Sequence, residues 1–238
     1  VDRYLVTWIC GIAVNGVYSI AYKIPSILEV FQSIFLQAWQ ISAVKSFEDN
    51  DKEIFFSQIY NTYNFFMVIL CSLLIILVKF VANIMFANEF YEAWVFVPII
   101  LLANVFGALS GLIGGVFSAV KDTRIYGFST TIGAITNIVL SIILIYFIGA
   151  MGAAIATAIS YFIVLVIRLI NSKKYISINI NFKRDLFVYI LLVLQAIFMI
   201  NIYSIKIYII EFIMLIFIIF AFHKEVESLV KKLKQYVF

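Results

Sequence analysis

Between Asn15 and Gln40 the sequence carries polar side chains at steps of three or four residues within an otherwise apolar segment. Steps of this size place the side chains on one face of an α-helix. This polar stripe consists of Asn15, Tyr18, Tyr22, Ser26, Glu29, Ser33, Gln37 and Gln40. A row of hydroxyl, amide and carboxylate groups can hydrogen-bond a polar ligand, and inside a membrane such a face lines a hydrated space. The stripe therefore predicts a transporter.

Charged residues accompany the stripe. Glu29 lies at its middle, where a charge in the bilayer centre costs about 2.5–3.5 kcal/mol. Its carboxylate either binds a cation or proton, or hydrogen-bonds a sugar hydroxyl, or is a structural partner of Lys23 or Arg3. Lys23 lies at the edge of the stripe, and Asp2 and Arg3 adjoin an apolar run and could form an ion pair at the mouth of a cavity.

Composition defines the class of protein. Of the 238 residues, 65% are hydrophobic and 13% are charged, against about 45–50% and 25% in soluble domains. We therefore expect an integral membrane protein. The net charge of +4 resides in short loops and does not indicate nucleic-acid binding. Cys10 and Cys71 lie in apolar stretches, and the single histidine, His223, lies outside the membrane core, so we expect no disulfide, metal, cofactor or catalytic centre.

Apolar runs of about 20 residues predict membrane-spanning helices. The predicted spans are 17–44, 55–79, 92–119, 125–148, 151–170, 185–203 and 205–222, after a partial span at 3–13. The expected fold class is all-α, a polytopic transmembrane helical bundle.

The loops predict the orientation. Three basic regions, 120–124, 168–185 and 224–234, alternate with weakly charged turns near 80–91, 149–150 and 201–206. The positive-inside rule places the basic regions, and with them the loop 45–54 and the C-terminal tail, in the cytoplasm. The protein is thus expected in the cytoplasmic membrane. The basic tail either contacts anionic lipid head groups or is simply solvated.

Small residues and prolines predict how the helices pack. Span 92–119 carries a ridge of small residues at four-residue steps, against which a neighbouring backbone can lie: Ala103, Gly107, Gly111, Gly115 and Ala119. Pro25 and Pro98 predict kinks within their spans. Asn137 is expected to hydrogen-bond another helix, and Glu211 to lie near the outer surface close to Lys206.

Three stretches in this order resemble the polysaccharide flippases of the multidrug/oligosaccharidyl-lipid/polysaccharide exporter superfamily. The first is Asp2-Arg3-Tyr4, then Gly11, then NGVYSIAYKI at 15–24. The second is EFYEAW at 89–94 leading to Val97-Pro98, and the third is Asn137 followed by GAMGAAIAT at 149–157.

The resemblance implies two helical lobes around a central cavity. Residues 1–172 match the C-terminal lobe of such a MATE-like transporter, and 173–238 add two trailing helices and the basic tail. The chain begins at Val1 without an initiator Met, and we expect an N-terminal lobe of the same protein as its partner. Proteins of this kind move an undecaprenyl-diphosphate-linked oligosaccharide, such as an O-antigen or other lipopolysaccharide repeat unit, between the leaflets.

The resulting hypothesis is a flippase for a lipid-linked oligosaccharide that works by alternating access, with membrane lipids and a coupling H+ or Na+ as further partners. Its substrate-binding residues would be Arg3, Tyr22, Lys23, Ser26, Glu29, Ser33, Gln37 and Gln40. Arg3 and Lys23 would attract the diphosphate, and the others would bind sugar hydroxyls. The alternatives are a cation-coupled multidrug exporter and, from another class, a membrane-embedded glycan polymerase or acyltransferase.

Overall fold

The computed structural model describes residues 2–47, 51–202 and 204–237, except the side chains at 88, 229 and 232–237. The elements in chain order are α1 (Asp2–Cys10), α2 (Ile12–Ala21), α3 (Pro25–Ser46), α4 (Lys52–Met85), the 3₁₀ helix η1 (Asn88–Val95), α5 (Val97–Ala119), α6 (Thr123–Ile148), α7 (Ala150–Ser172), α8 (Phe182–Asn201), α9 (Ile207–Ala221) and α10 (His223–Val237). The described residues form helices and no strand, which confirms the all-α class.

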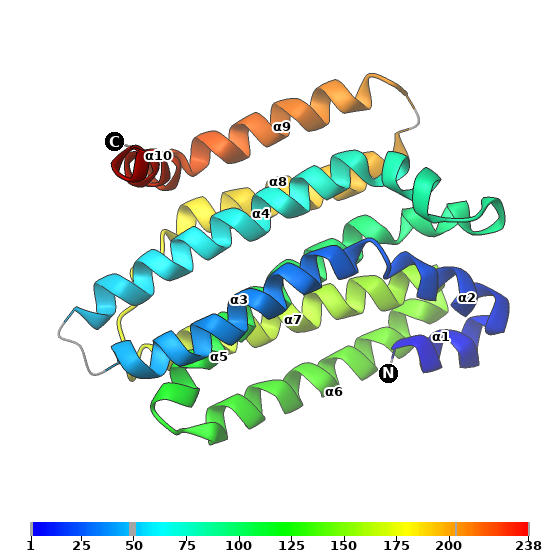
Figure 1. Ribbon diagram of the computed structural model, residues 1–238. Coiled ribbons are helices and arrows are strands. Elements are labelled where there is room, and N and C mark those ends of the chain that lie inside the picture. Colours follow the sequence, from blue (N-terminus) through cyan, green and yellow to red (C-terminus); the bar gives the residue numbers. More distant parts are fainter. Residues whose placement is uncertain (1, 48–50, 203, 238) are drawn as a thin grey trace.

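Six helices are long and apolar enough to cross a membrane: α3, α4, α5, α6, α7 and α8. The shorter apolar helices α2 and α9 accompany them. Figure 1 shows the long helices running side by side as a bundle. The chain is therefore a polytopic helical membrane protein, as its composition predicts.

The predicted continuous helix over 17–44 is wrong. The chain forms two helices instead, α2 and α3, with a turn at residues 22–24. Pro25 is the first residue of α3 and has no N–H to continue the ladder of α2. The expected kink is thus a complete break, and a second break comes at Gly11, whose φ of 93° suits glycine. The stripe is therefore divided, with Asn15 and Tyr18 on α2 and five members on α3.

The central helix of the bundle is α5, and its glycines receive large side chains. Between Val97 and Phe117 its residues are buried except Ile99, Gly107 and Gly111, which are half-buried. A Cβ at Gly111 would lie 3.1 Å from Leu36 of α3, and one at Gly115 would meet the ring of Trp39. Trp39 Nε1 also donates to the carbonyl oxygen of Leu112 at 2.9 Å. The predicted ridge packs as expected, but against side chains rather than a backbone.

A close approach of two backbones does occur between α6 and α7. Gly149, with a φ of 62°, ends α6, and a Cβ on Gly152 would meet the backbone of Leu144 and Ile145. The small residues of this turn thus let the two helices lie closely together.

Two ends of the bundle differ in charge. In Figure 1 the α5–α6 loop, the α7–α8 linker and the start of α10 lie at one end, and the turns after α4 and between α8 and α9 lie at the other. The alternation expected from the basic regions is therefore present in the fold. Residues 48–50 of the acidic loop lie outside the described residues. Which end faces the cytoplasm stays a prediction.

We predict that Gly115→Ala destabilises the protein by about 1–3 kcal/mol, because its methyl group would push Trp39 out of a filled site. The matched control is Gly127→Ala on the exposed side of α6, where no atom lies within 4 Å of the added Cβ. There we expect a gain of up to about 1 kcal/mol from helix propensity. Thermal unfolding in detergent measures both, and equal effects would contradict the packing of α3 on α5.

Candidate functional site

The polar stripe of α3 lies along a flank of the helix and is accessible from outside the bundle. Its members Ser26, Glu29, Ser33, Gln37 and Gln40 are all exposed. The buried residues Leu28, Trp39 and Ala43 lie on the adjoining face of the helix, and exposed apolar residues such as Ile34 and Ile41 lie on the far side of the stripe. The stripe is therefore accessible and is not sealed in a seam between helices.

Two of the stripe hydroxyls are partly used within α3 itself. Ser26 Oγ donates to the carbonyl oxygen of Lys23 at 2.7 Å, and Ser33 Oγ donates to that of Val30 at 2.8 Å. Their oxygens still have lone pairs and can accept hydrogen bonds from a ligand. The amides of Gln37 and Gln40 can both donate and accept.

Glu29 meets an amide rather than a cation. Asn104 Nδ2 of α5 donates to Glu29 Oε1 at 3.1 Å and also lies 3.4 Å from the carbonyl oxygen of Pro25. Among the described residues the ion pairs are those of Arg184, so neither Lys23 nor Arg3 pairs with Glu29. The structural ion pair considered for Glu29 is therefore wrong, and its second carboxylate oxygen remains available to a ligand.

At the end of α3 the structure brings Arg3 and Tyr22 together. The Arg3 guanidinium lies 4.7 Å from the centroid of the Tyr22 ring, and the Tyr22 hydroxyl lies 3.0 Å from that of Tyr18. Arg3 is exposed, and Lys23, next in sequence to Tyr22, is exposed as well. Two cations thus lie near the α2–α3 turn, with an aromatic ring to orient one of them.

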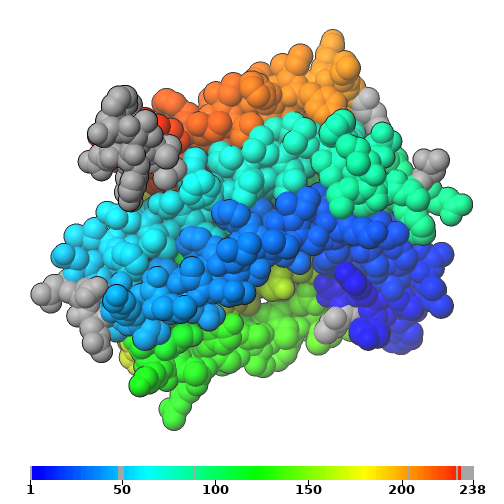
Figure 2. Space-filling model, in the orientation of Figure 1, coloured from blue at the N-terminus to red at the C-terminus, as the bar shows by residue number. Residues whose placement is uncertain are grey.

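A groove runs beside the stripe, between α3 and the pair α6–α7. Figure 2 shows this hollow between the blue and the green surfaces. Below the surface, the side chains of Tyr161 on α7 and Leu36 on α3 pack over Gly107 and Gly111 of α5. We call this hollow the α3 groove.

A second polar cluster joins α1, α6 and α7. The Thr157 hydroxyl donates to Asp2 Oδ2 at 2.6 Å, and Asn137 Nδ2 donates to the Thr157 oxygen at 3.1 Å. The interhelical hydrogen bond expected of Asn137 is confirmed. Asp2 pairs with these groups rather than with Arg3, so the ion pair considered for Asp2 and Arg3 is absent from the described residues.

Arg168 is not a loop residue, as the basic region 168–185 suggested. It lies within α7 and is only 4% exposed. Its guanidinium donates to Ser129 Oγ at 3.0 Å, Thr130 Oγ1 at 2.9 Å and the Ser110 carbonyl oxygen at 2.8 Å, and lies 4.2 Å from the Tyr126 ring centroid. In the sequence, the position of Arg168 inside an apolar run indicates a residue within a span. In the structure, its side chain joins α5, α6 and α7.

Glu211 is not near the outer surface either. It is fully buried in α9, and Gln195 Nε2 of α8 donates to its backbone oxygen at 3.2 Å.

The bundle also has an apolar pocket of about 510 Å³. It lies between α5, α7 and α8, with Phe106, Phe162 and Tyr189 in its wall.

The comparisons with known proteins bear on the fold and the family. No family model matches the chain. The probable low-salt glycan biosynthesis flippase Agl15 of Haloferax volcanii is 24% identical over 177 residues, which cover 71% of this chain and 36% of that protein. The lipid II flippase MurJ in its inward closed conformation has the same fold, with a TM-score of 0.62 and 16% identity over 97% of this chain and 52% of that one.

The expected resemblance to flippases agrees with both comparisons, since the protein similar in sequence and the protein similar in fold are both described as flippases. The chain spans about a third of one relative and about half of the other. Both similar proteins are flippases, that is transporters and not enzymes, in agreement with the class expected from the sequence.

We predict that Arg168→Lys destabilises the protein by about 2–4 kcal/mol, because an ammonium group cannot reproduce three diverging hydrogen bonds from one planar fork. Arg124→Lys, the same change at an exposed position of α6, should shift stability by less than about 0.5 kcal/mol. Chemical or thermal unfolding in detergent compares the two, and an Arg168→Lys protein as stable as the parent would refute the proposed role in joining three helices.

Proposed function

We propose that this chain supplies one lobe of a flippase that moves a lipid-linked glycan across the membrane by alternating access. The observation that carries the proposal is the row of exposed polar side chains along a membrane-spanning helix, from Ser26 to Gln40. Such a row is unfavourable against acyl chains and favourable against water or a hydroxylated ligand. At 1.5 Å per residue it extends over about 21 Å, the length of several sugar rings.

The proposed ligand is an oligosaccharide repeat unit, of the O-antigen kind, on undecaprenyl diphosphate in the cytoplasmic membrane. Arg3 and Lys23 would bind the diphosphate, since guanidinium and ammonium groups form strong charge-assisted hydrogen bonds with phosphate oxygens. The sugar hydroxyls would meet Tyr22, Ser26, Glu29, Ser33, Gln37 and Gln40. In the predicted orientation Arg3 and Lys23 lie toward the outer leaflet, because the α2–α3 turn is at the end opposite the basic loops.

The proposal assigns residues 1–172 to the lobe that bears the groove and residues 173–238 to the trailing helices α8 and α9 and the cytoplasmic tail. An N-terminal lobe of the same protein would face the α3 groove. The part of each relative that this chain covers, 36% and 52%, supports that arrangement. The lipid tail would stay in the bilayer, where the apolar pocket beside Phe106 and Phe162 can receive it.

Two carboxylates can serve a coupling ion in the proposed cycle. Asp2 binds groups on α6 and α7 through Thr157, and Glu29 binds α5 through Asn104. Neither has a cation partner among the described residues. Protonation or Na+ binding would neutralise such a charge inside the membrane. The ion gradient would thereby control how these helices pack against one another.

We predict that Glu29→Ala and Gln37→Ala in the full-length protein each lower glycan translocation about tenfold, because each removes hydrogen bonds to the sugar worth about 1.5 kcal/mol. Surface polysaccharide per molecule of membrane-inserted protein measures the effect. Ile34→Ala is the control, since Ile34 is exposed on α3 beside the stripe. Unimpaired polysaccharide in both stripe variants would remove the stripe from the mechanism.

We also predict that Asp2→Asn uncouples transport from the ion gradient while leaving the fold intact, because an amide still accepts the hydrogen bond of Thr157 but no longer carries a charge. Uptake of a lipid-linked glycan into proteoliposomes, with and without a proton or Na+ gradient, measures the coupling. If the protein were instead a cation-coupled drug exporter, cells carrying Asp2→Asn would lose resistance to cationic dyes. Retained gradient dependence in Asp2→Asn would exclude Asp2 as the coupling group.

A further inference from the structure

The last helix does not continue the direction of the spans. Helix α9 ends at Ala221, and α10 starts at His223 after one non-helical residue, Phe222. Figure 1 shows α10 nearly end-on while α9 is seen from the side, so α10 turns away from the direction of α9. This turn lies at the end of the bundle that carries the basic loops.

The sequence of α10 is amphipathic. Its apolar residues recur at three- and four-residue steps and fall on one face: Val226, Leu229, Val230, Leu233 and Val237. The side chain of Val230 is 45% exposed, so this face is not covered by the bundle at that point. The remaining positions carry four lysines, Lys224, Lys231, Lys232 and Lys234, against Glu225 and Glu227.

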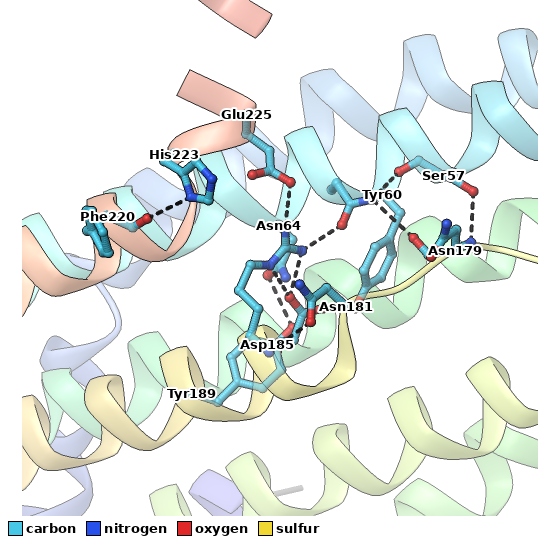
Figure 3. A network of polar contacts seen from close by, with 12 residues as sticks. Ser57, Tyr60, Asn64, Asn179, Asn181, Asp185, Tyr189, Phe220, His223 and Glu225 are labelled. Carbon is cyan, nitrogen blue, oxygen red and sulfur yellow. Dashed lines mark hydrogen bonds and ion pairs between the residues drawn. The ribbon is translucent and has the colours of Figure 1, made fainter. Parts of the chain in front are cut away.

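An ion-pair network fixes the first turn of α10 to the bundle (Figure 3). Arg184 of α8 pairs with both Glu225 of α10 and Asp185 of its own helix. Its guanidinium also donates to Asn61 Oδ1 of α4 at 2.6 Å and lies 4.5 Å from the Phe222 ring centroid. This network holds the start of α10 against α8 and α4 and pairs Glu225 with Arg184, which leaves Glu227 as the other acidic residue in the sequence of α10.

A polar cleft shows which way the polar face of α10 turns. A pocket of about 770 Å³ separates α10 from α4 and the α7–α8 linker. Its wall includes Lys224 and Ser228 of α10, together with Ser57 and Asn61 of α4. Lys224 and Ser228 are four residues apart and share a face of the helix. Val226 and Val230 therefore lie on the opposite face of the helix, turned away from this polar cleft.

We propose that α10 is an interfacial helix that binds a leaflet rich in anionic phospholipids. Its apolar stripe enters the boundary between head groups and acyl chains, and its lysines pair with lipid phosphates on either side of the stripe. The observations that carry the proposal are the change of direction between α9 and α10, the exposed Val230 and the excess of lysine once Arg184 has paired with Glu225. The proposal does not depend on what the protein transports.

The test places one reporter on each face of α10 in the otherwise intact protein. Val230→Cys and Ser228→Cys, in a Cys10→Ser background, are labelled with a bimane fluorophore; Cys71 is fully buried. Each sample is reconstituted in nanodiscs of neutral phosphatidylcholine or of the same lipid with about one third phosphatidylglycerol. Quenching by doxyl-labelled lipid reports insertion, and quenching by iodide reports exposure to water.

We expect lipid-borne quenching at least twofold stronger at position 230 than at 228, and the reverse for iodide. The anionic lipid should raise the difference, and Lys231→Glu with Lys234→Glu should remove that increase. Equal quenching at both positions would show a solvated helix and overturn the proposal. A difference that does not respond to lipid charge or to the lysine substitutions would overturn the binding of anionic lipid.

Discussion

A polar group inside the hydrocarbon of a membrane costs free energy unless it meets a partner or water. Two polar residues within the bundle illustrate how protein partners meet this requirement. Arg168 donates to three oxygens on α5 and α6, and Asp2 accepts from Thr157. These groups are satisfied by protein. On α3, Ser26 and Ser33 donate to carbonyl oxygens of their own helix and Glu29 accepts from Asn104, whereas the exposed amides of Gln37 and Gln40 have no such partner among the described residues. These amides therefore require water or a ligand, and the α3 groove is where either can reach them.

The way the helices pack around α5 leaves the polar side chains of α3 exposed. Large side chains from two neighbours fill the positions of its glycines: Leu36 and Trp39 come from α3, and Tyr161 comes from α7. Helix α3 is thereby held by one face only, while its polar face stays open (Figure 2). The glycines of α5 thus let the side chains of α3 and α7 pack closely against it.

Much of this architecture can be predicted from local patterns. Apolar length gives the spans, a period of three to four residues gives the open face of α3, and Pro25 gives the position of a bend, though not a complete break. What could not be predicted depends on neighbours distant in sequence. Arg168 looks like a loop cation until Ser129 and Thr130, nearly forty residues away, are placed beside it. Glu211 was expected at a surface, but it lies buried against Gln195.

The buried and the exposed polar groups have separable consequences. A buried group such as Arg168 holds three helices together, so its loss lowers stability before it can affect transport. An exposed group such as Gln37 contributes little to the fold, so its substitution changes binding while the protein stays folded. Glu29 shares features of both classes. One of its carboxylate oxygens accepts a hydrogen bond from Asn104, and the residue is nevertheless exposed. Measuring stability and transport on the same variants therefore separates the scaffold from the site, and Glu29 is the residue at which both should respond.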